Sequence, residues 1–164
     1  MPLDLIAELE AVVDALAREG IEYALCGGIA LGLHGHPRAT IDIDLLVRGE
    51  HLANAMRVAG GLGFDIPARK TVFGLRSGQR REMHRISKLD PDSNDLISLD
   101  LLVVNQELED VWVGRIELTV GQHQMTVVSR AGLATMKRIA GRRQDLADLA
   151  KLEGTDEDDD ATEE

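Results

Sequence analysis

Two short stretches decide the fold: Cys-Gly-Gly-Ile-Ala at positions 26–30 and Ile-Asp-Ile-Asp-Leu-Leu-Val at positions 41–47. The second stretch predicts a strand, and side chains alternate between the two faces of a strand, so Asp42 and Asp44 point to the same side. Two adjacent carboxylates repel each other and lose hydration, a cost that a divalent cation removes. Hard oxygen ligands with open positions suit Mg²⁺ that also holds a phosphate. The pair therefore predicts a Mg²⁺ or Mn²⁺ site that faces a phosphorylated ligand.

Two further features point to the same chemistry. Gly27 and Gly28 allow a ligand to approach the backbone closely and expose N–H groups at a helix start, where phosphates bind well. Asp100 is a charged residue inside the otherwise apolar, strongly β-forming run Ile97–Val104, where a plain core would avoid it. We therefore expect phosphates to lie between the glycine amides and a metal ion.

The surrounding pattern predicts an α+β domain with a mixed sheet and C-terminal helices, because strands and helices do not alternate regularly. Helical spacing of apolar residues and a serine cap favour helices. Turn residues separate the β-forming runs. The expected helices are 3–18, 29–33, 50–59, 130–140 (capped by Ser129) and 142–152, and the expected strands are 22–26, 40–47, 71–75, 82–89, 97–104, 113–120 and 124–128.

The order of strand, Gly-Gly, short helix and Asp-x-Asp in a second strand resembles the polymerase-β-type nucleotidyltransferase superfamily. Members of that superfamily share a third carboxylate on a later strand, and Asp100 matches it. The resemblance implies the polymerase-β-like fold, with a mixed sheet flanked by helices. It also implies that Asp42, Asp44 and Asp100 are catalytic and bind metal.

A finer resemblance is to small bacterial nucleotidyltransferases of the abortive-infection toxin type. Arg38-x-Thr40-x-Asp42-x-Asp44 matches their N-terminal motif, and a Lys, then Arg residues, then Asp-Leu-x-Asp-Leu match their C-terminal one at positions 137–149. The resemblance implies that Arg38 and Thr40 flank the nucleotide, that Lys137 neutralises its triphosphate, and that Asp145 orients Lys137 or a metal-bound phosphate. It implies a tRNA or protein acceptor and a cognate antitoxin or toxin partner.

Composition limits the alternatives. The 164 residues suit one domain at 1–153, and the tail Gly154–Glu164 carries seven of the 29 acids without Lys or Arg, so we expect it to be disordered. A basic coat protein is excluded by a net charge of −11, and a disulfide scaffold by the single cysteine, Cys26. No apolar run is long enough to cross a bilayer, and the N-terminus lacks signal-peptide features, so we expect a cytoplasmic protein that does not bind membranes.

Each signal also has a plainer interpretation. An isolated Asp-x-Asp usually marks a solvated face, and paired glycines usually mark a turn. Lys137 suits a surface helix position equally well, and Asp145 and Asp148 are by default solvated helix charges, although Asp145 suits a helix cap. The conjunction in the correct order, rather than any one motif, favours the nucleotidyltransferase interpretation.

A basic run interrupts the acidic chain: Arg69–Lys88 holds seven basic residues against one acid, Glu82. Such a run suits a polyanion, either the triphosphate or an RNA acceptor, and equally suits a solubilised hairpin.

Three functions stay open. The first is nucleoside monophosphate transfer from an NTP to a hydroxyl of tRNA or protein, with release of pyrophosphate. The second is transfer to a small molecule of the aminoglycoside type, for which Glu107, Glu109 and Asp110 could hold a cationic substrate. The third is a non-catalytic antitoxin or regulatory module that retains the fold.

Overall fold

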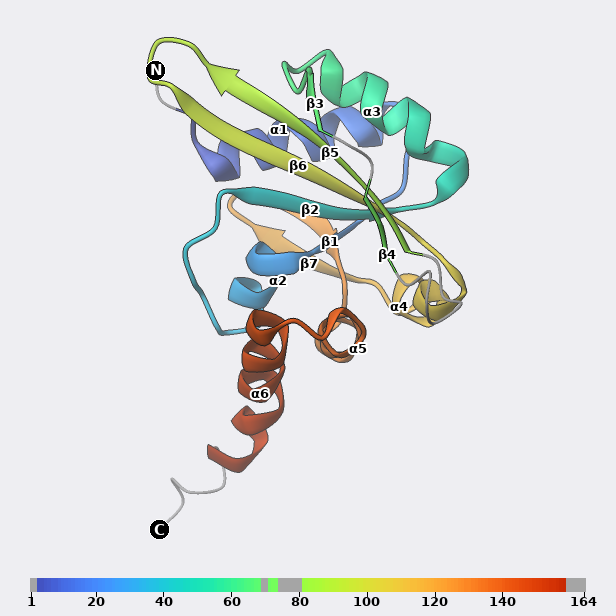
Figure 1. Cartoon of the computed structure of the whole chain (residues 1–164), viewed down its shortest axis with the longest axis vertical. Coiled ribbons are helices and arrows are strands. Elements are labelled where there is room, and N and C mark those ends of the chain that lie inside the picture. The colour runs from blue at the N-terminus through green and yellow to red at the C-terminus, as the bar shows by residue number, and fades with distance from the viewer. Residues whose placement is uncertain (1–2, 69–70, 74–80, 159–164) are drawn as a thin grey trace.

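The computed structural model describes residues 3–68, 71–73 and 81–158 of the chain. In this part of the chain, an eight-stranded mixed sheet has the order β3-β5-β6-β2-β1-β8-β7, and β4 pairs with β5 (Figure 1). The strands are β1 (Ala24–Cys26), β2 (Asp42–Val47), β3 (Ile66–Pro67), β4 (Thr71–Phe73), β5 (Arg81–Asp90), β6 (Asp95–Val103), β7 (Ile116–Val120) and β8 (His123–Val127). The pairs β2–β6 and β1–β8 are parallel, and the remaining pairs are antiparallel.

Helices cover both faces of this sheet. Helices α1 and α3 lie on one side, and α2, α5 and α6 lie on the other (Figure 1). The helices are α1 (Leu5–Arg18), α2 (Gly27–Leu33), α3 (Leu52–Gly60), α4 (Glu109–Val113), α5 (Arg130–Ala140) and α6 (Arg143–Asp158), with short 3₁₀ turns at Gly49–His51 and Gln106–Leu108. The predicted α+β architecture with a mixed sheet and C-terminal helices is therefore confirmed.

The core lies between α1 and the central strands. Leu9, Val12 and Leu16 of α1 are at most 1% exposed and pack in one cluster with residues such as Leu45 and Leu101. The central strand β2 carries apolar residues on this face and its two aspartates on the other. Burial of the apolar face thus fixes the register of β2, because a shift by one residue would exchange the two faces.

Several boundaries differ from the prediction. Helix α2 begins at Gly27 rather than residue 29, and β2 begins at Asp42 rather than residue 40. Val113 was expected to begin a strand, but it is the last residue of helix α4, which was not predicted. Val111 and Trp112 of this helix are buried and pack into the core. The β-forming residues around Val113 favour a strand, but the packing of Val111 and Trp112 from one helical face outweighs that propensity.

The C-terminal helices are largely as predicted. Ser129 caps α5 by accepting a hydrogen bond from the Gly132 amide, and Gly141 ends that helix in a left-handed conformation. Helix α6 continues to Asp158, six residues beyond the expected end at Leu152, although Gly154 lies within it. The division at 153 and the disorder of the tail remain predictions, and residues 159–164 lie outside the described part. No helix in the described ranges has the length and apolar character needed to span a membrane.

Candidate active site

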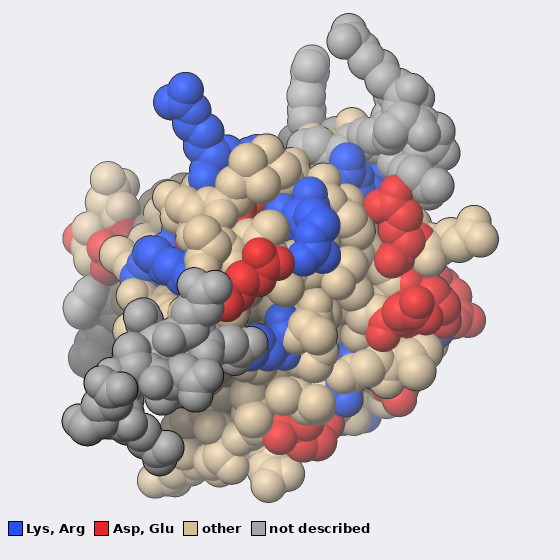
Figure 2. Space-filling view, turned by 90° about the horizontal axis from the view of Figure 1, so that it is seen from below, with Lys and Arg blue, Asp and Glu red and all other residues tan. Residues whose placement is uncertain are grey.

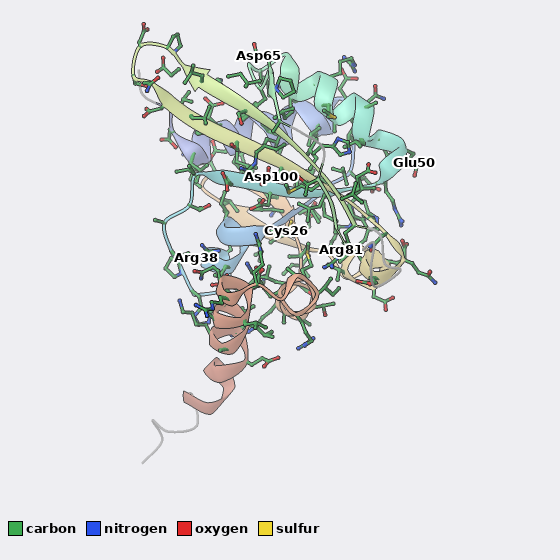
Figure 3. The ribbon with its side chains drawn as sticks, in the orientation of Figure 1. Cys26, Arg38, Glu50, Asp65, Arg81 and Asp100 are labelled. Atoms are coloured by element: carbon green, nitrogen blue, oxygen red, sulfur yellow. The ribbon has the colours of Figure 1, made fainter. Side chains whose placement is uncertain are left out.

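The carboxylate cluster, defined as Asp42, Asp44 and Asp100, forms where β2 and β6 run in parallel. Asp44 lies directly opposite Asp100 in the register, and Asp42 lies two residues earlier on the same face of β2. All three side chains therefore point to one side of the sheet, the side covered by α2. Figure 3 shows Asp100 above α2, and Cys26 is the last residue of β1, directly before α2.

Burial and mutual repulsion make this cluster electrostatically unusual. Asp100 is 3% exposed. The pKa of Asp44 is raised to about 7, first by burial and then by the charge of Asp100, a hydrogen bond between the two carboxyl groups and the charge of Asp42, whereas Lys137 opposes the shift. Burial likewise raises the pKa of the adjacent Cys26 thiol. The site therefore holds more negative charge than its own surroundings compensate.

Gly27 is required for the position of Asp44. Its φ of +68° is unfavourable for other residues, and a Cβ atom there would overlap the Asp44 carboxylate. A Cβ on Gly28 would lie 3.3 Å from Thr40, tighter than an ordinary contact. The Thr40 hydroxyl in turn accepts a hydrogen bond from the Asp42 amide at 3.3 Å. The two glycines thus bring helix α2 against the carboxylate cluster and the residues that precede it.

Arg85, which the sequence analysis treated only as a member of the basic run that suits a polyanion, contacts the cluster directly. It lies opposite Asp100 in the β5–β6 register, and its Nε and Nη2 donate to the two Asp100 oxygens at 2.7 and 2.9 Å. Its Nη2 also lies 3.6 Å from Asp42 Oδ2. The hydrogen bonds to Asp100 raise the pKa of Arg85, so the guanidinium stays charged.

A second charged group, the lysine network, centres on the C-terminal helices. It consists of Lys137 of α5, Asp145 and Asp148 of α6, Arg142 between these helices, and Arg38 in the loop before β2. Lys137 Nζ lies 2.9 Å from Asp148 Oδ2 and 3.5 Å from Asp145 Oδ1. Arg38 reaches Asp148 at 3.2 Å, and Figure 3 shows Arg38 in the loop beside the start of α6. Lys137, Asp145 and Asp148 are 6%, 2% and 0% exposed.

These exposures correct the expectation that Asp145 and Asp148 are solvated helix charges, and they exclude a surface position for Lys137. Burial alone would raise the pKa of Asp148, but hydrogen bonds from Lys137 and Gln144 hold it below its usual value. Hydrogen bonds from Arg142 similarly lower the pKa of Asp145 against the effect of burial. Asp145 also accepts a hydrogen bond from the Arg142 amide at 3.2 Å, so the predicted helix cap is present.

The described members of the basic run make contacts within the protein, which is not expected of a surface that binds nucleic acid. Arg85 pairs with Asp100, Lys88 with Glu8, and Arg81 donates to the Ile139 carbonyl oxygen. The other basic residues lie outside the described residues, namely Arg69, Lys70, Arg76 and Arg80. On the face seen in Figure 2, the visible basic and acidic side chains are interspersed rather than gathered into one basic surface.

The donor chemistry of the carboxylate cluster fits a hard divalent cation, because it consists of carboxylate oxygens that repel one another. In the described ranges, however, no group of three or more His, Cys, Asp or Glu side chains is placed so that all of them could hold one metal ion. Both Asp100 oxygens are instead engaged by Arg85.

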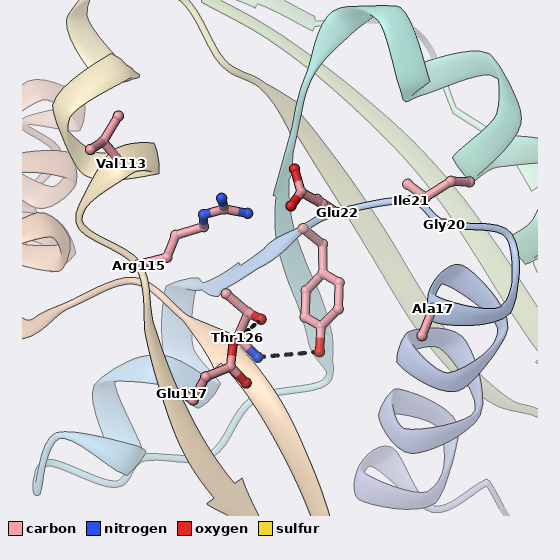
Figure 4. A pocket seen from close by; sticks show the side chains of 9 residues that line it. Ala17, Gly20, Ile21, Glu22, Val113, Arg115, Glu117 and Thr126 are labelled. Atoms are coloured by element: carbon pink, nitrogen blue, oxygen red, sulfur yellow. Dashed lines mark hydrogen bonds between the residues drawn. The ribbon is translucent and has the colours of Figure 1, made fainter.

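A separate cavity of about 400 Å³ lies at the opposite end of β1 (Figure 4). Its polar lining includes Glu22, Arg115, Glu117 and the Tyr23 hydroxyl, which accepts a hydrogen bond from the Thr126 amide. None of the predicted site residues lines it.

The fold matches that of polymerase-β-type nucleotidyltransferases. No family model matches the chain, and no curated protein matches it by sequence. Among solved structures, TM1012 from Thermotoga maritima, a proposed nucleotidyltransferase, matches with a TM-score of 0.62 and 16% identity over 89% of this chain and 90% of that chain.

Two antibiotic-modifying enzymes have the same fold. The lincosamide antibiotic adenylyltransferase LnuA, bound to lincomycin, matches with a TM-score of 0.56 and 15% identity over 90% of this chain and 95% of that chain. ANT(2″)-Ia in complex with adenylyl-2″-tobramycin matches with a TM-score of 0.61 and 12% identity over 92% of this chain and 88% of that chain. At these identities the similarity establishes the fold and not the function.

Proposed function

We propose that this protein is a metal-dependent nucleotidyltransferase that transfers a nucleoside monophosphate from an NTP to an acceptor hydroxyl and releases pyrophosphate. The observation that carries the proposal is the register of β2 and β6, which places Asp44 beside Asp100 with Asp42 on the same face. Gly27 supports it, because the backbone there leaves room only for the Asp44 carboxylate. The shared fold supports the reaction class.

Asp42, Asp44 and Asp100 are the residues that would hold Mg²⁺ or Mn²⁺. When bound, such a cation supplies Lewis-acid polarisation of the phosphate and charge neutralisation. Asp100 would receive the proton of the acceptor hydroxyl as the hydroxyl oxygen bonds to the α-phosphorus. The bond from that phosphorus to the bridging oxygen breaks, and the electron pair leaves with pyrophosphate.

The remaining predicted residues position the nucleotide in this proposal. The amides at Gly27 and Gly28 and the nearby Thr40 border the carboxylate cluster, where they can orient phosphates. Lys137 acts from a buried position, and its charge reaches Asp44, where it opposes but does not cancel the rise in the pKa of that group. Lys137 is held by Asp145 and Asp148, and Asp148 is also held by Arg38. We assign these residues the task of fixing positive charge behind the nucleotide site.

For the acceptor we propose a hydroxyl of tRNA or protein, with a role as a toxin–antitoxin component. The support is the motif resemblance at Arg38–Asp44 and Lys137–Leu149, together with the ion pairs that join Lys137 to Asp145 and Asp148 of the second motif. The basic run gives less support, because three of its members make internal contacts.

A small-molecule acceptor is the second candidate, and one observation favours it. The chain matches LnuA and ANT(2″)-Ia over 88–95% of their lengths, so it has nearly the extent of enzymes that modify antibiotics. Of the three acids considered for a cationic substrate, Glu109 is engaged by Arg48, whose hydrogen bonds lower the pKa of Glu109.

The experiment is transfer of label from each of the four [α-³²P]NTPs to bulk tRNA, to total protein, to aminoglycosides and to lincosamides, with Mg²⁺ or Mn²⁺ present. The wild type should label one acceptor class, and Asp44→Asn should label none. Asp65→Asn, an exposed substitution with the same charge change, is the matched control and should retain activity. No labelling of any acceptor, in the presence of a cellular extract that supplies partners, would favour the non-catalytic module.

A further inference from the structure

The position of Arg85 raises a question about how the carboxylate cluster accepts a cation. Its guanidinium forks onto both oxygens of Asp100 and extends toward Asp42, so it contacts two of the three carboxylates at once. Among the described residues, Arg85 forms ion pairs with two members of this cluster, Asp100 and Asp42. The Arg85 side chain thus occupies the position that a positive ligand of the cluster would take.

The fork and a divalent cation compete for the same oxygens. A Mg²⁺ ion binds carboxylate oxygens at about 2.0–2.1 Å, whereas the two Arg85 nitrogens lie 2.7 and 2.9 Å from those oxygens. A dication on Asp100 would therefore lie within a few ångströms of the guanidinium and repel it strongly. Arg85 cannot relieve this repulsion by losing a proton, because a guanidinium stays protonated in proteins.

The surroundings of Arg85 allow it to leave. Its side chain is 39% exposed, whereas the Asp100 side chain is 5% exposed. The arginine therefore reaches the cluster from the solvent side, and a change of its side-chain torsions moves the guanidinium away without displacing a buried residue. Asp100, in contrast, is fixed in the centre of β6.

We propose that Arg85 is the resident counter-ion of the carboxylate cluster and that a divalent cation must displace it from Asp100 to assemble the site. The proposal rests on the metal-binding role proposed for the cluster. Arg85 stabilises the metal-free protein by compensating the buried carboxylates, and it lowers the affinity for the cation by the same contact. The alternative, in which Arg85 orients Asp100 for the metal, predicts the opposite sign.

The test is Mn²⁺ titration of the whole chain by calorimetry, without nucleotide. Arg85→Met should bind Mn²⁺ about tenfold more tightly than the wild type, and Arg85→Lys, which keeps the charge but not the fork, should fall between them. Arg48→Met is the matched control, because it removes an equivalent fork to Glu109 away from the cluster and should leave Mn²⁺ binding unchanged. Equal or weaker binding by Arg85→Met overturns the proposal.

Two further measurements separate the possible failures. If the wild type binds Mn²⁺ and Asp44→Asn does not, but Arg85→Met binds no more tightly, only the role of Arg85 fails. If neither the wild type nor Arg85→Met binds at millimolar Mn²⁺, the proposed metal site fails and the inference with it.

Should Arg85→Met not fold, the wild type itself gives the answer by NMR of the arginine Nε–Hε groups. The Arg85 signal, identified by its absence from Arg85→Lys, should shift as Mg²⁺ saturates the protein. A signal that stays unchanged at saturation overturns the proposal.

Discussion

The two buried charge groups of this protein differ in their balance. The carboxylate cluster sets three acids against one base, Arg85, and the pKa of Asp44 is raised to about 7. The lysine network sets two acids against three bases, and the pKa values of both acids are lowered. The first group lacks positive charge and the second has it in excess.

This difference separates two tasks. A buried group with too few counter-charges is costly until a ligand supplies them, as expected of a functional site. A buried group whose acids all have cationic partners is satisfied in the folded protein and holds its neighbours in place, so its loss destabilises the fold. We therefore expect substitutions in the lysine network to destabilise the protein and substitutions in the carboxylate cluster to remove function.

The largest effect on stability should come from Asp148→Ala. This change leaves the buried Lys137 with Asp145 at 3.5 Å as its remaining ion-pair partner in the lysine network, and it also removes the partner of Arg38. Breaking such a buried pair should lower the free energy of unfolding by about 3–5 kcal/mol, measured by urea denaturation. Glu153→Ala, which breaks the exposed pair with Arg138, should cost no more than about 0.5 kcal/mol. Equal costs for the two variants would refute the structural role of the network.

Gly27→Ala tests the junction between α2 and the carboxylate cluster. Gly20→Ala is its matched control, because both glycines have a φ of +68° but only Gly27 lies against another side chain. The control should cost about 1 kcal/mol through backbone strain. Gly27→Ala should cost about 1–3 kcal/mol more through overlap with Asp44, and it should weaken Mn²⁺ binding. Calorimetric Mn²⁺ affinities that are the same in both variants would contradict the assigned contact.

The pH dependence of the metal-free protein tests the raised pKa of Asp44. Because the folded carboxyl group keeps its proton up to about pH 7 and the unfolded one loses it near 3.8, the folded state binds more protons in this window. Stability should therefore fall as the pH rises from about 4 to about 7. Asp44→Asn should remove this component and exceed the wild type by on the order of 2 kcal/mol at about pH 8 in EDTA. The free energy of unfolding is measured by denaturation at each pH. If the wild-type value rises over this window relative to that of the variant, burial does not hold the proton on Asp44.

The smallest effect should come from deleting the tail Gly154–Glu164. Helix α6 is anchored by Leu152, which is 3% exposed and whose carbonyl oxygen accepts a hydrogen bond from Arg130. The acidic segment Gly154–Glu164 contains no large apolar residue that could pack against the fold. Deletion should change the free energy of unfolding by less than about 0.5 kcal/mol and leave transfer activity intact. Loss of activity in the labelling assay would assign the tail a function.

The sequence predicted the carboxylate cluster because its signals are local. Alternation in β2 places Asp42 and Asp44 on one face, and an isolated charge in an apolar strand marks Asp100. Ser129 was likewise identified as a helix cap from its position alone. Burial of the apolar faces of β2 and β6 then fixes the register that places Asp44 opposite Asp100.

Arg85 and Asp148 could not be found in the same way. Arg85 faces Asp100 only because of the β5–β6 register, and in the sequence it was one basic residue among seven in the basic run. Asp148 meets Arg38 from 110 positions away, and helix periodicity alone does not distinguish a buried aspartate from a solvated one. Its spacing of three residues from Asp145 was the available signal, since residues at that spacing share a helix face.

The most direct measurement is an anomalous diffraction map of crystals grown with Mn²⁺ and a non-hydrolysable NTP analogue. The account predicts manganese density at Asp42, Asp44 and Asp100, with the triphosphate beside Gly27 and Gly28 and the Arg85 guanidinium released from Asp100. Manganese density at Asp145 and Asp148 instead, or an Arg85 fork that still holds Asp100 with no manganese at the carboxylate cluster, would contradict it.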